Sequence, residues 1–235
     1  MDEVHSDWGE WLPRAIADAD SDSLTVWYLG CNGVVLKTPG GTTLFVDPYL
    51  GTGDPPRTVR MIPVPFDPAD VREADAVLAT HEHTDHVHGP SQGPILESTG
   101  ATFYGPDASV DVLHDEGWTD AYDIAPGQIQ QVRESQSLEI GDLTVHVEPA
   151  NDPDADHPVS YVFEHQSGTF FHAGDARPGE FEAVGEAYDL DAGVIAFGSA
   201  GMIPDKETRE PKRTKWYNDE NMLVEAANEL QATRV

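Results

Sequence analysis

Short apolar runs broken by polar turns predict a chain built from many strands. Residues 24–29 form the first run. Residues 34–37 and 43–47 flank Pro39-Gly40-Gly41, and residues 160–164 and 169–173 flank Gln166-Ser167-Gly168, so each pair predicts a hairpin. The remaining strands are predicted at 76–80, 101–104, 128–133, 137–140, 142–148 and 194–197.

Helical spacing of apolar residues between these strands predicts several helices. They are expected at 8–16, 68–74, 91–98, 106–116 and 219–230. Asp67 followed by Pro68 is a typical start for the second of them. Hairpins followed by alternating helices and strands predict two sheets covered by helices, an α/β sandwich. A length of 235 residues favours a single domain spanning 1–235.

The strand predicted at 76–80 runs directly into a polar loop that carries four of the ten histidines within eight residues. Residues 81–86 are His-Glu-His-Thr-Asp-His. Two residues apart in extended backbone, His81 and His83 point the same way and can bind one ion, while Asp85 and His86 reach a second. Imidazole nitrogens and carboxylate oxygens are ligands of divalent transition metals. A helical His-Glu-x-x-His site is excluded, because position 85 is Asp. The remaining alternative is a solvated polar loop.

The charge balance is strongly acidic, with 43 acidic and 13 basic residues and a formal net charge of −30. Only four lysines occur, and the acids are spread along the chain. This composition favours a protein from a salt-rich cytoplasm, with an ordinary acidic protein as the alternative. Nucleic-acid binding is disfavoured, because a phosphate backbone requires a basic surface.

We therefore predict that the folded state requires salt. At molar salt the Debye length is about 3 Å, so repulsion among the surface carboxylates is screened. The melting temperature should rise strongly in thermal melts from low to molar KCl. A flat or falling trend would show that the acidity has another origin.

The single cysteine, Cys31, excludes an intramolecular disulfide and agrees with a reducing cytoplasm. We expect Cys31 to be a small buried residue. The first residues show no signal-peptide pattern, and no run reaches the roughly 18 apolar residues of a transmembrane helix. The sequence thus predicts a cytoplasmic protein with no membrane partner.

The spacing His-x-His-x-Asp-His after a strand resembles the signature of the metallo-β-lactamase-fold hydrolases. An early hairpin ending in Asp47 and a later strand leading to Asp175 agree with the order of elements in that superfamily. The resemblance implies an αββα sandwich and a site for one or two divalent ions, in which Asp175 bridges the metals. Asp47 is expected to support the site from behind or to form a turn.

Further motifs are similar to those of the L-ascorbate-6-phosphate lactonases over essentially the whole chain. They include Trp8-Gly9-Glu10-Trp11-Leu12, residues 27–33, Gly51-Thr52-Gly53 and residues 75–81. The resemblance implies a metal-dependent hydrolase that opens a phosphorylated sugar-acid lactone, with manganese favoured over zinc or iron. It also assigns Asp152 as a ligand, with His157 as the alternative, and Asp85 as both ligand and general base.

Five of the thirteen basic residues lie within ten positions, from Lys206 to Lys215. Lys206 and Arg209 are therefore candidates for contact with a phosphate on a small anionic substrate. The alternative is a solvated loop whose charge is balanced by Glu207 and Glu210.

The lactonase family continues beyond position 235 into a further strand and a loop with another metal-binding His. The sequence therefore predicts a sandwich without its last strand, and little lactonase activity unless that segment is restored. A fragment, a site completed by a neighbour and an incomplete second metal position remain alternatives. An unpaired sheet edge there would favour a homo-oligomer. Rival functions are a phosphodiesterase or another hydrolase of this fold, and a non-catalytic scaffold.

Overall fold

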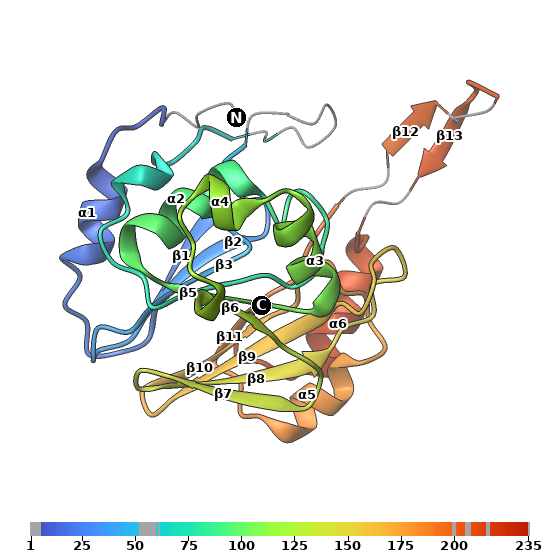
Figure 1. The fold of residues 1–235 in the computed structure, drawn as a ribbon. Helices are drawn as coiled ribbons and strands as arrows, with labels where there is room; N and C mark the ends of the chain where they lie inside the picture. The colour runs from blue at the N-terminus through green and yellow to red at the C-terminus, as the bar shows by residue number, and fades with distance from the viewer. Residues whose placement is uncertain are drawn as a thin grey trace.

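Two β-sheets pack face to face, and helices cover their outer sides (Figure 1). The computed structural model describes residues 6–51, 60, 62–198, 201–204, 208–214 and 217–234. The αββα sandwich that the sequence predicts is confirmed.

The first sheet has six strands in the order β1-β2-β3-β4-β5-β6. The first three strands are antiparallel, and β3 to β6 run parallel. Their bounds are β1 Thr25–Gly30, β2 Gly33–Lys37, β3 Thr43–Val46, β4 Ala76–Leu78, β5 Thr102–Gly105 and β6 Ile129–Gln131. Strand β2 is buried on both faces, with Val34 and Leu36 toward the second sheet and Val35 toward the helices. This explains its unbroken apolar run.

The second sheet has five strands in the order β11-β10-β9-β8-β7. All neighbours are antiparallel except β10 and β11. The bounds are β7 Gln136–Ile140, β8 Leu143–Pro149, β9 Val159–His165, β10 Gly168–His172 and β11 Ala192–Val194. Val145, Tyr161 and Phe163 of this sheet share one buried cluster with β2, β3 and β4, which forms the centre of the sandwich.

The helices divide between the two outer faces (Figure 1). The first sheet is covered by α1 Trp11–Ala17, α2 Gly89–Thr99, α3 Asp107–Asp115 and α4 Trp118–Ala121. The second is covered by α5 Phe181–Ala187 and α6 Glu220–Leu230. Short 3-10 turns occur at η1 Pro68–Asp70 and η2 Pro126–Gln128. Within the described residues, no helix combines the length and apolarity that crossing a bilayer requires.

Two predicted elements are wrong in extent. The helix expected at 68–74 is the single turn η1, because the chain becomes extended at Val71, whose side chain enters the core. The strand expected at 194–197 is β11, which ends at Val194, and Phe197 beyond it is 55% exposed.

Helices α4 and α5 and the strands β12 and β13 escaped the sequence analysis. Helix α5 was missed because glycine at its centre weakens the helical signal. Gly185 is required there, since a Cβ would lie 2.2 Å from the Glu229 carbonyl oxygen on α6. No strand was predicted at β12 Gly201–Pro204 or β13 Pro211–Thr214, which pair as a hairpin that projects from the body of the molecule (Figure 1).

Candidate metal centre

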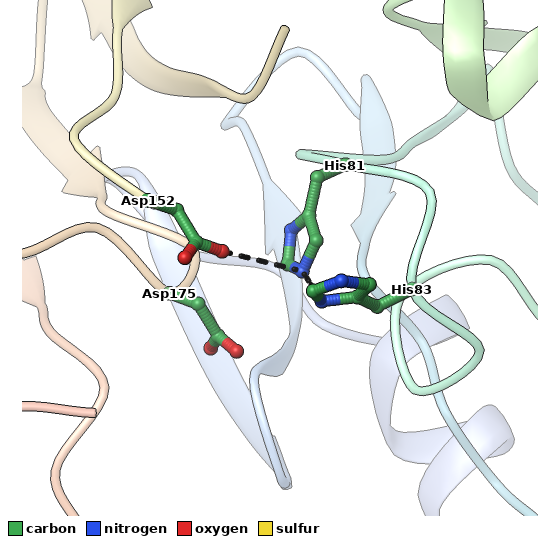
Figure 2. A group of neighbouring side chains, drawn as sticks. All are labelled: His81, His83, Asp152 and Asp175. Carbon is green, nitrogen blue, oxygen red and sulfur yellow. Dashed lines mark hydrogen bonds and ion pairs between the residues drawn. The ribbon is translucent and has the colours of Figure 1, made fainter. Parts of the chain in front are cut away.

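Four polar side chains gather where three strands end, as Figure 2 shows. His81 and His83 follow β4, Asp152 follows β8 and Asp175 follows β10. One ligand atom from each lies within 4.8 Å of the others. His83 is partly exposed, whereas the other three residues are buried. We refer to these four residues as the His/Asp group.

The hydrogen-bond partners of the two histidines assign their tautomers. His83 Nε2 lies 3.0 Å from the carbonyl oxygen of Asp154, so it carries the proton. Thr80 Oγ1 donates to Asp47 at 2.7 Å and therefore accepts from His81 Nδ1 at 3.0 Å. Both remaining nitrogens, His81 Nε2 and His83 Nδ1, are unprotonated and lie 2.9 Å apart. Two facing lone pairs repel each other unless a cation lies between them.

Burial disfavours the charged forms of His81 and Asp152. Burial and the nearby His86 and His83 hold the pKa of His81 well below its usual value, so its imidazole is neutral. Burial raises the pKa of Asp152, and the neighbouring Asp175 raises it further. A bound divalent ion would favour the ionised carboxylates, because an opposite charge close by offsets the penalty of burial.

His86 lies beside the His/Asp group and is held from behind by Asp47. Its Nδ1 is 2.8 Å from Asp47 Oδ2, and its Nε2 is 3.5 Å from Asp175 Oδ2. Asp47 is fully buried and also accepts from the Thr80 backbone N–H at 2.8 Å. Although burial opposes the charged form, the carboxylates of Asp47 and Asp175 hold the pKa of His86 well above its usual value. These contacts place Asp47 behind His86, where it can support the site as the sequence analysis expects.

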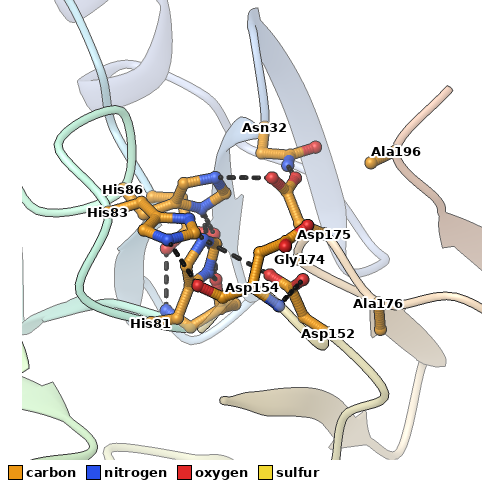
Figure 3. A network of polar contacts seen from close by, with 12 residues as sticks. Asn32, His81, His83, His86, Asp152, Asp154, Gly174, Asp175, Ala176 and Ala196 are labelled. Carbon is orange, nitrogen blue, oxygen red and sulfur yellow. Dashed lines mark hydrogen bonds and ion pairs between the residues drawn. The ribbon is translucent and has the colours of Figure 1, made fainter. Parts of the chain in front are cut away.

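Asp175 is oriented by a residue that the sequence analysis did not select. Asn32, in the turn between β1 and β2, donates from Nδ2 to Asp175 Oδ1 (Figure 3). The carbonyl oxygen of Asn32 accepts a hydrogen bond from His172 Nε2 at 2.7 Å. The only sequence signal of Asn32 is its place in the Gly-Cys-Asn-Gly turn, and it lies 143 residues from Asp175 in the chain.

Asp85 lies outside the His/Asp group, on the side of Cys31 and Tyr217. It is partly buried, and its charge acts on both of those side chains. Burial raises the pKa of Tyr217, and the carboxylates of Asp175 and Asp85 raise it further. Cys31 is exposed rather than buried, because it occupies the turn after β1 with φ at 54°. Tyr217 carries no sequence signal that would have linked it to the site.

The structure does not bring the other described candidates into the His/Asp group. His157 is exposed and bonded to Asp107 at 2.9 Å, so the alternative to Asp152 is not brought into the group. Arg209 is exposed between β12 and β13, and within the described part of the chain it makes no hydrogen bond or ion pair. Lys206 lies outside the described residues.

The donor set of the His/Asp group fits a divalent transition metal. Two neutral imidazoles and two carboxylates are the mixed ligands that such ions take, and the separation of 2.9 Å between the two nitrogens is compatible with metal–nitrogen bonds of about 2.0–2.1 Å. His86 Nε2 lies 3.5 Å from Asp175 Oδ2, and Asp85 precedes His86 in the same loop, so these residues could hold a second ion that shares Asp175.

Comparison with known sequences gives one family and a set of curated relatives. The beta-lactamase superfamily domain matches residues 42–235. Proteins named probable L-ascorbate-6-phosphate lactonase UlaG, from Escherichia coli and from Shigella boydii, are 29% identical to this chain over 240 residues. The match covers 84% of this chain and 66% of each relative, so the chain spans just under two thirds of their length.

Solved structures agree on the fold. Igni18, a metallo hydrolase from Ignicoccus hospitalis, is 18% identical with a TM-score of 0.62, over 89% of this chain and 79% of that one. YhfI of Bacillus subtilis, a metallo-beta-lactamase fold protein, is 16% identical with a TM-score of 0.59, over 90% and 83%. CmlA of Streptomyces venezuelae, a diiron beta-hydroxylase, is 19% identical with a TM-score of 0.63, over 90% and 44%. These likenesses establish the metallo-β-lactamase fold, which serves more than one chemistry.

Proposed function

Because this chain belongs to the beta-lactamase superfamily, we propose that it is a metal-dependent hydrolase that opens a sugar-acid lactone. The lactone is chosen over other substrates because relatives at 29% identity are named probable L-ascorbate-6-phosphate lactonases. Fold and superfamily alone support hydrolysis in general, so the choice of substrate depends on that likeness.

The observation that carries the proposal is the pair of facing nitrogens beside two buried carboxylates. His81 Nε2 and His83 Nδ1 lie 2.9 Å apart, and in the neutral tautomers that Thr80 and Asp154 select neither nitrogen carries a proton. Asp152 and Asp175 complete the set, with one oxygen of Asp152 3.9 Å from His81 Nε2. A folded protein does not gain stability from such an arrangement unless a cation occupies it.

A bound divalent ion supplies a nucleophile at neutral pH, by lowering the pKa of water toward about 7, and polarises a carbonyl oxygen. The protein supplies orientation and a proton acceptor. Asp85 makes no hydrogen bond among the described residues and is partly buried beside the group, so its carboxylate is free to accept a proton from water. Asn32 and Thr80 hold Asp175 and His81 in place, which keeps the ligands preorganised.

We also infer manganese as the metal, a phosphorylated substrate and a reducing, salt-rich cytoplasm. Mixed imidazole and carboxylate ligands suit manganese, with zinc and iron as competitors. The substrate phosphate would be bound by the basic segment that includes Lys206 and Arg209, since guanidinium and ammonium groups bind phosphate well.

The test is a substrate panel with metal-loaded protein in molar KCl. The panel contains a sugar-acid lactone with and without phosphate, bis(4-nitrophenyl) phosphate and 4-nitrophenyl acetate, each measured with manganese, zinc and iron. We expect the highest kcat/KM for the phosphorylated lactone with manganese. A preference for the phosphodiester would replace the proposed substrate, and protein that retains no metal after dialysis would favour a scaffold.

A further inference from the structure

The backbone around Tyr217 is fixed beside Asp175 by the next residue. Asn218 is fully buried, and its Nδ2 donates to the carbonyl oxygens of Ala176 and Ala196, each at 2.9 Å. Figure 3 shows both alanines on the opposite side of Asp175 from the histidines. The backbone at Tyr217 therefore lies on the side of Asp175 that the histidines do not occupy.

Several chain segments converge on the phenol of Tyr217. The carboxylates of Asp175, Asp85 and Asp152 and the thiol of Cys31 all act on it electrostatically. These residues follow strands β10, β4, β8 and β1. These groups of the site thus lie close enough to the phenol for their charges to act on it.

This hydroxyl makes no hydrogen bond within the described part of the chain, although the phenol is partly buried. Two other tyrosines have partners: Tyr161 donates to the Ala79 carbonyl oxygen, and Tyr28 donates to that of Cys31. The hydroxyl is not among the described buried polar atoms that lack a partner, so it is open to water or to a bound molecule, and phenylalanine would pack equally well. The hydroxyl is therefore not explained by packing.

The backbone also argues for a special role. Tyr217 has φ at 53°, in the left-handed region that a bulky residue rarely adopts and that costs on the order of 1 kcal/mol. The two hydrogen bonds of the buried Asn218 hold the adjoining backbone and offset this cost. Strain of this kind is typical of residues that a fold aims at a ligand.

We infer that Tyr217 is a substrate-contacting residue whose hydroxyl donates a hydrogen bond to the carbonyl oxygen of the bound lactone. The inference rests on the proposed function for the identity of that carbonyl. The carboxylates and unprotonated nitrogens around the site are acceptors, so the phenol supplies a donor that they lack. Donors aimed at a developing oxyanion typically contribute about 10²–10³-fold to kcat.

The chemistry balances without any proton leaving Tyr217. The oxygen of a water molecule forms a bond to the lactone carbonyl carbon, and the ring C–O bond breaks. The proton that water loses passes to the released alkoxide, through Asp85 in the proposed function. Tyr217 keeps its own proton and stabilises the negative charge on the carbonyl oxygen while the ring opens.

The experiment compares Tyr217→Phe with Tyr188→Phe in manganese-loaded protein. Tyr188 is the matched control because its hydroxyl bonds Glu148, at the end of α5 and outside the site. We expect Tyr217→Phe to lower kcat for the lactone about 100-fold, with KM, bound metal and melting temperature close to wild type. Tyr188→Phe should retain wild-type kcat. A kcat for Tyr217→Phe within twofold of wild type would overturn the inference.

If the lactone is not the substrate, the experiment gives results that differ from those of a wrong role for Tyr217. If wild type prefers the phosphodiester, the lactone proposal is wrong, and the same comparison of kcat is made on that substrate. If wild type hydrolyses nothing in the panel, the role of Tyr217 is tested by calorimetric titration of wild type and Tyr217→Phe with gluconate and with inorganic phosphate. Binding at least tenfold weaker in Tyr217→Phe supports the inference, whereas equal binding, or none in wild type, overturns it.

Discussion

Replacing His81 and His83 together with alanine is expected to remove bound metal and to lower kcat/KM by at least about 10³-fold. The two imidazoles supply half of the His/Asp group, and the carboxylates left behind would have to hold an ion alone. A metal ion supplies several kcal/mol of transition-state stabilisation. Since each 1.36 kcal/mol is tenfold in rate, its loss gives an effect of this size.

The measurement is metal content by elemental analysis after refolding in manganese or zinc, together with kcat/KM. Wild type should retain at least one equivalent, and the double variant at least one equivalent fewer. The control replaces His146 and His157, which pair with Glu164 and Asp107 away from the group. Unchanged metal content in the His81 and His83 variant would mean that the ion binds elsewhere.

The sequence predicted the sandwich because each sheet repeats strong local signals. Turns such as Pro39-Gly40-Gly41 fix hairpins, and apolar runs such as residues 34–37 are long enough to identify buried strands. Helix α5 could not be predicted in this way. Its position depends on contact between Gly185 and the backbone of α6, and glycine removes the local helical signal.

The same difference between local signals and long-range contacts applies to the residues of the site. His81 and His83 are recognisable because their spacing in one loop carries the chemistry. Asn32 bonds Asp175, and Tyr217 comes within range of its charge, only through the folding of distant segments, and neither residue type is a metal ligand in the sequence patterns considered. Separation in sequence hides such contacts, so only a structure could assign them.

Asp47→Asn is expected to remove the second metal position while leaving the first. The Asp47 carboxylate accepts from the Thr80 backbone N–H, from the Thr80 hydroxyl and from His86 Nδ1. These bonds leave His86 Nε2 unprotonated when the imidazole is neutral, and an unprotonated nitrogen is required of a ligand.

An amide cannot accept at both positions. If its oxygen keeps the bond from the Thr80 N–H, its NH₂ group faces His86 Nδ1, which must then accept a hydrogen bond. The His86 proton moves to Nε2, and that nitrogen can no longer bind an ion. If the amide is turned round, the buried Thr80 N–H loses its acceptor, which destabilises the fold by about 1–3 kcal/mol.

Metal titration and kinetics separate these consequences. We expect Asp47→Asn to bind one fewer equivalent of metal than wild type and to lose about 10–100-fold in kcat/KM, the usual effect of removing the partner of a metal-binding histidine. Asp142→Asn is the control, because Asp142 accepts from the hydroxyls of Thr38 and Thr42 with no role at the site. Full metal occupancy and wild-type kcat/KM in Asp47→Asn would show that His86 does not bind an ion through Nε2.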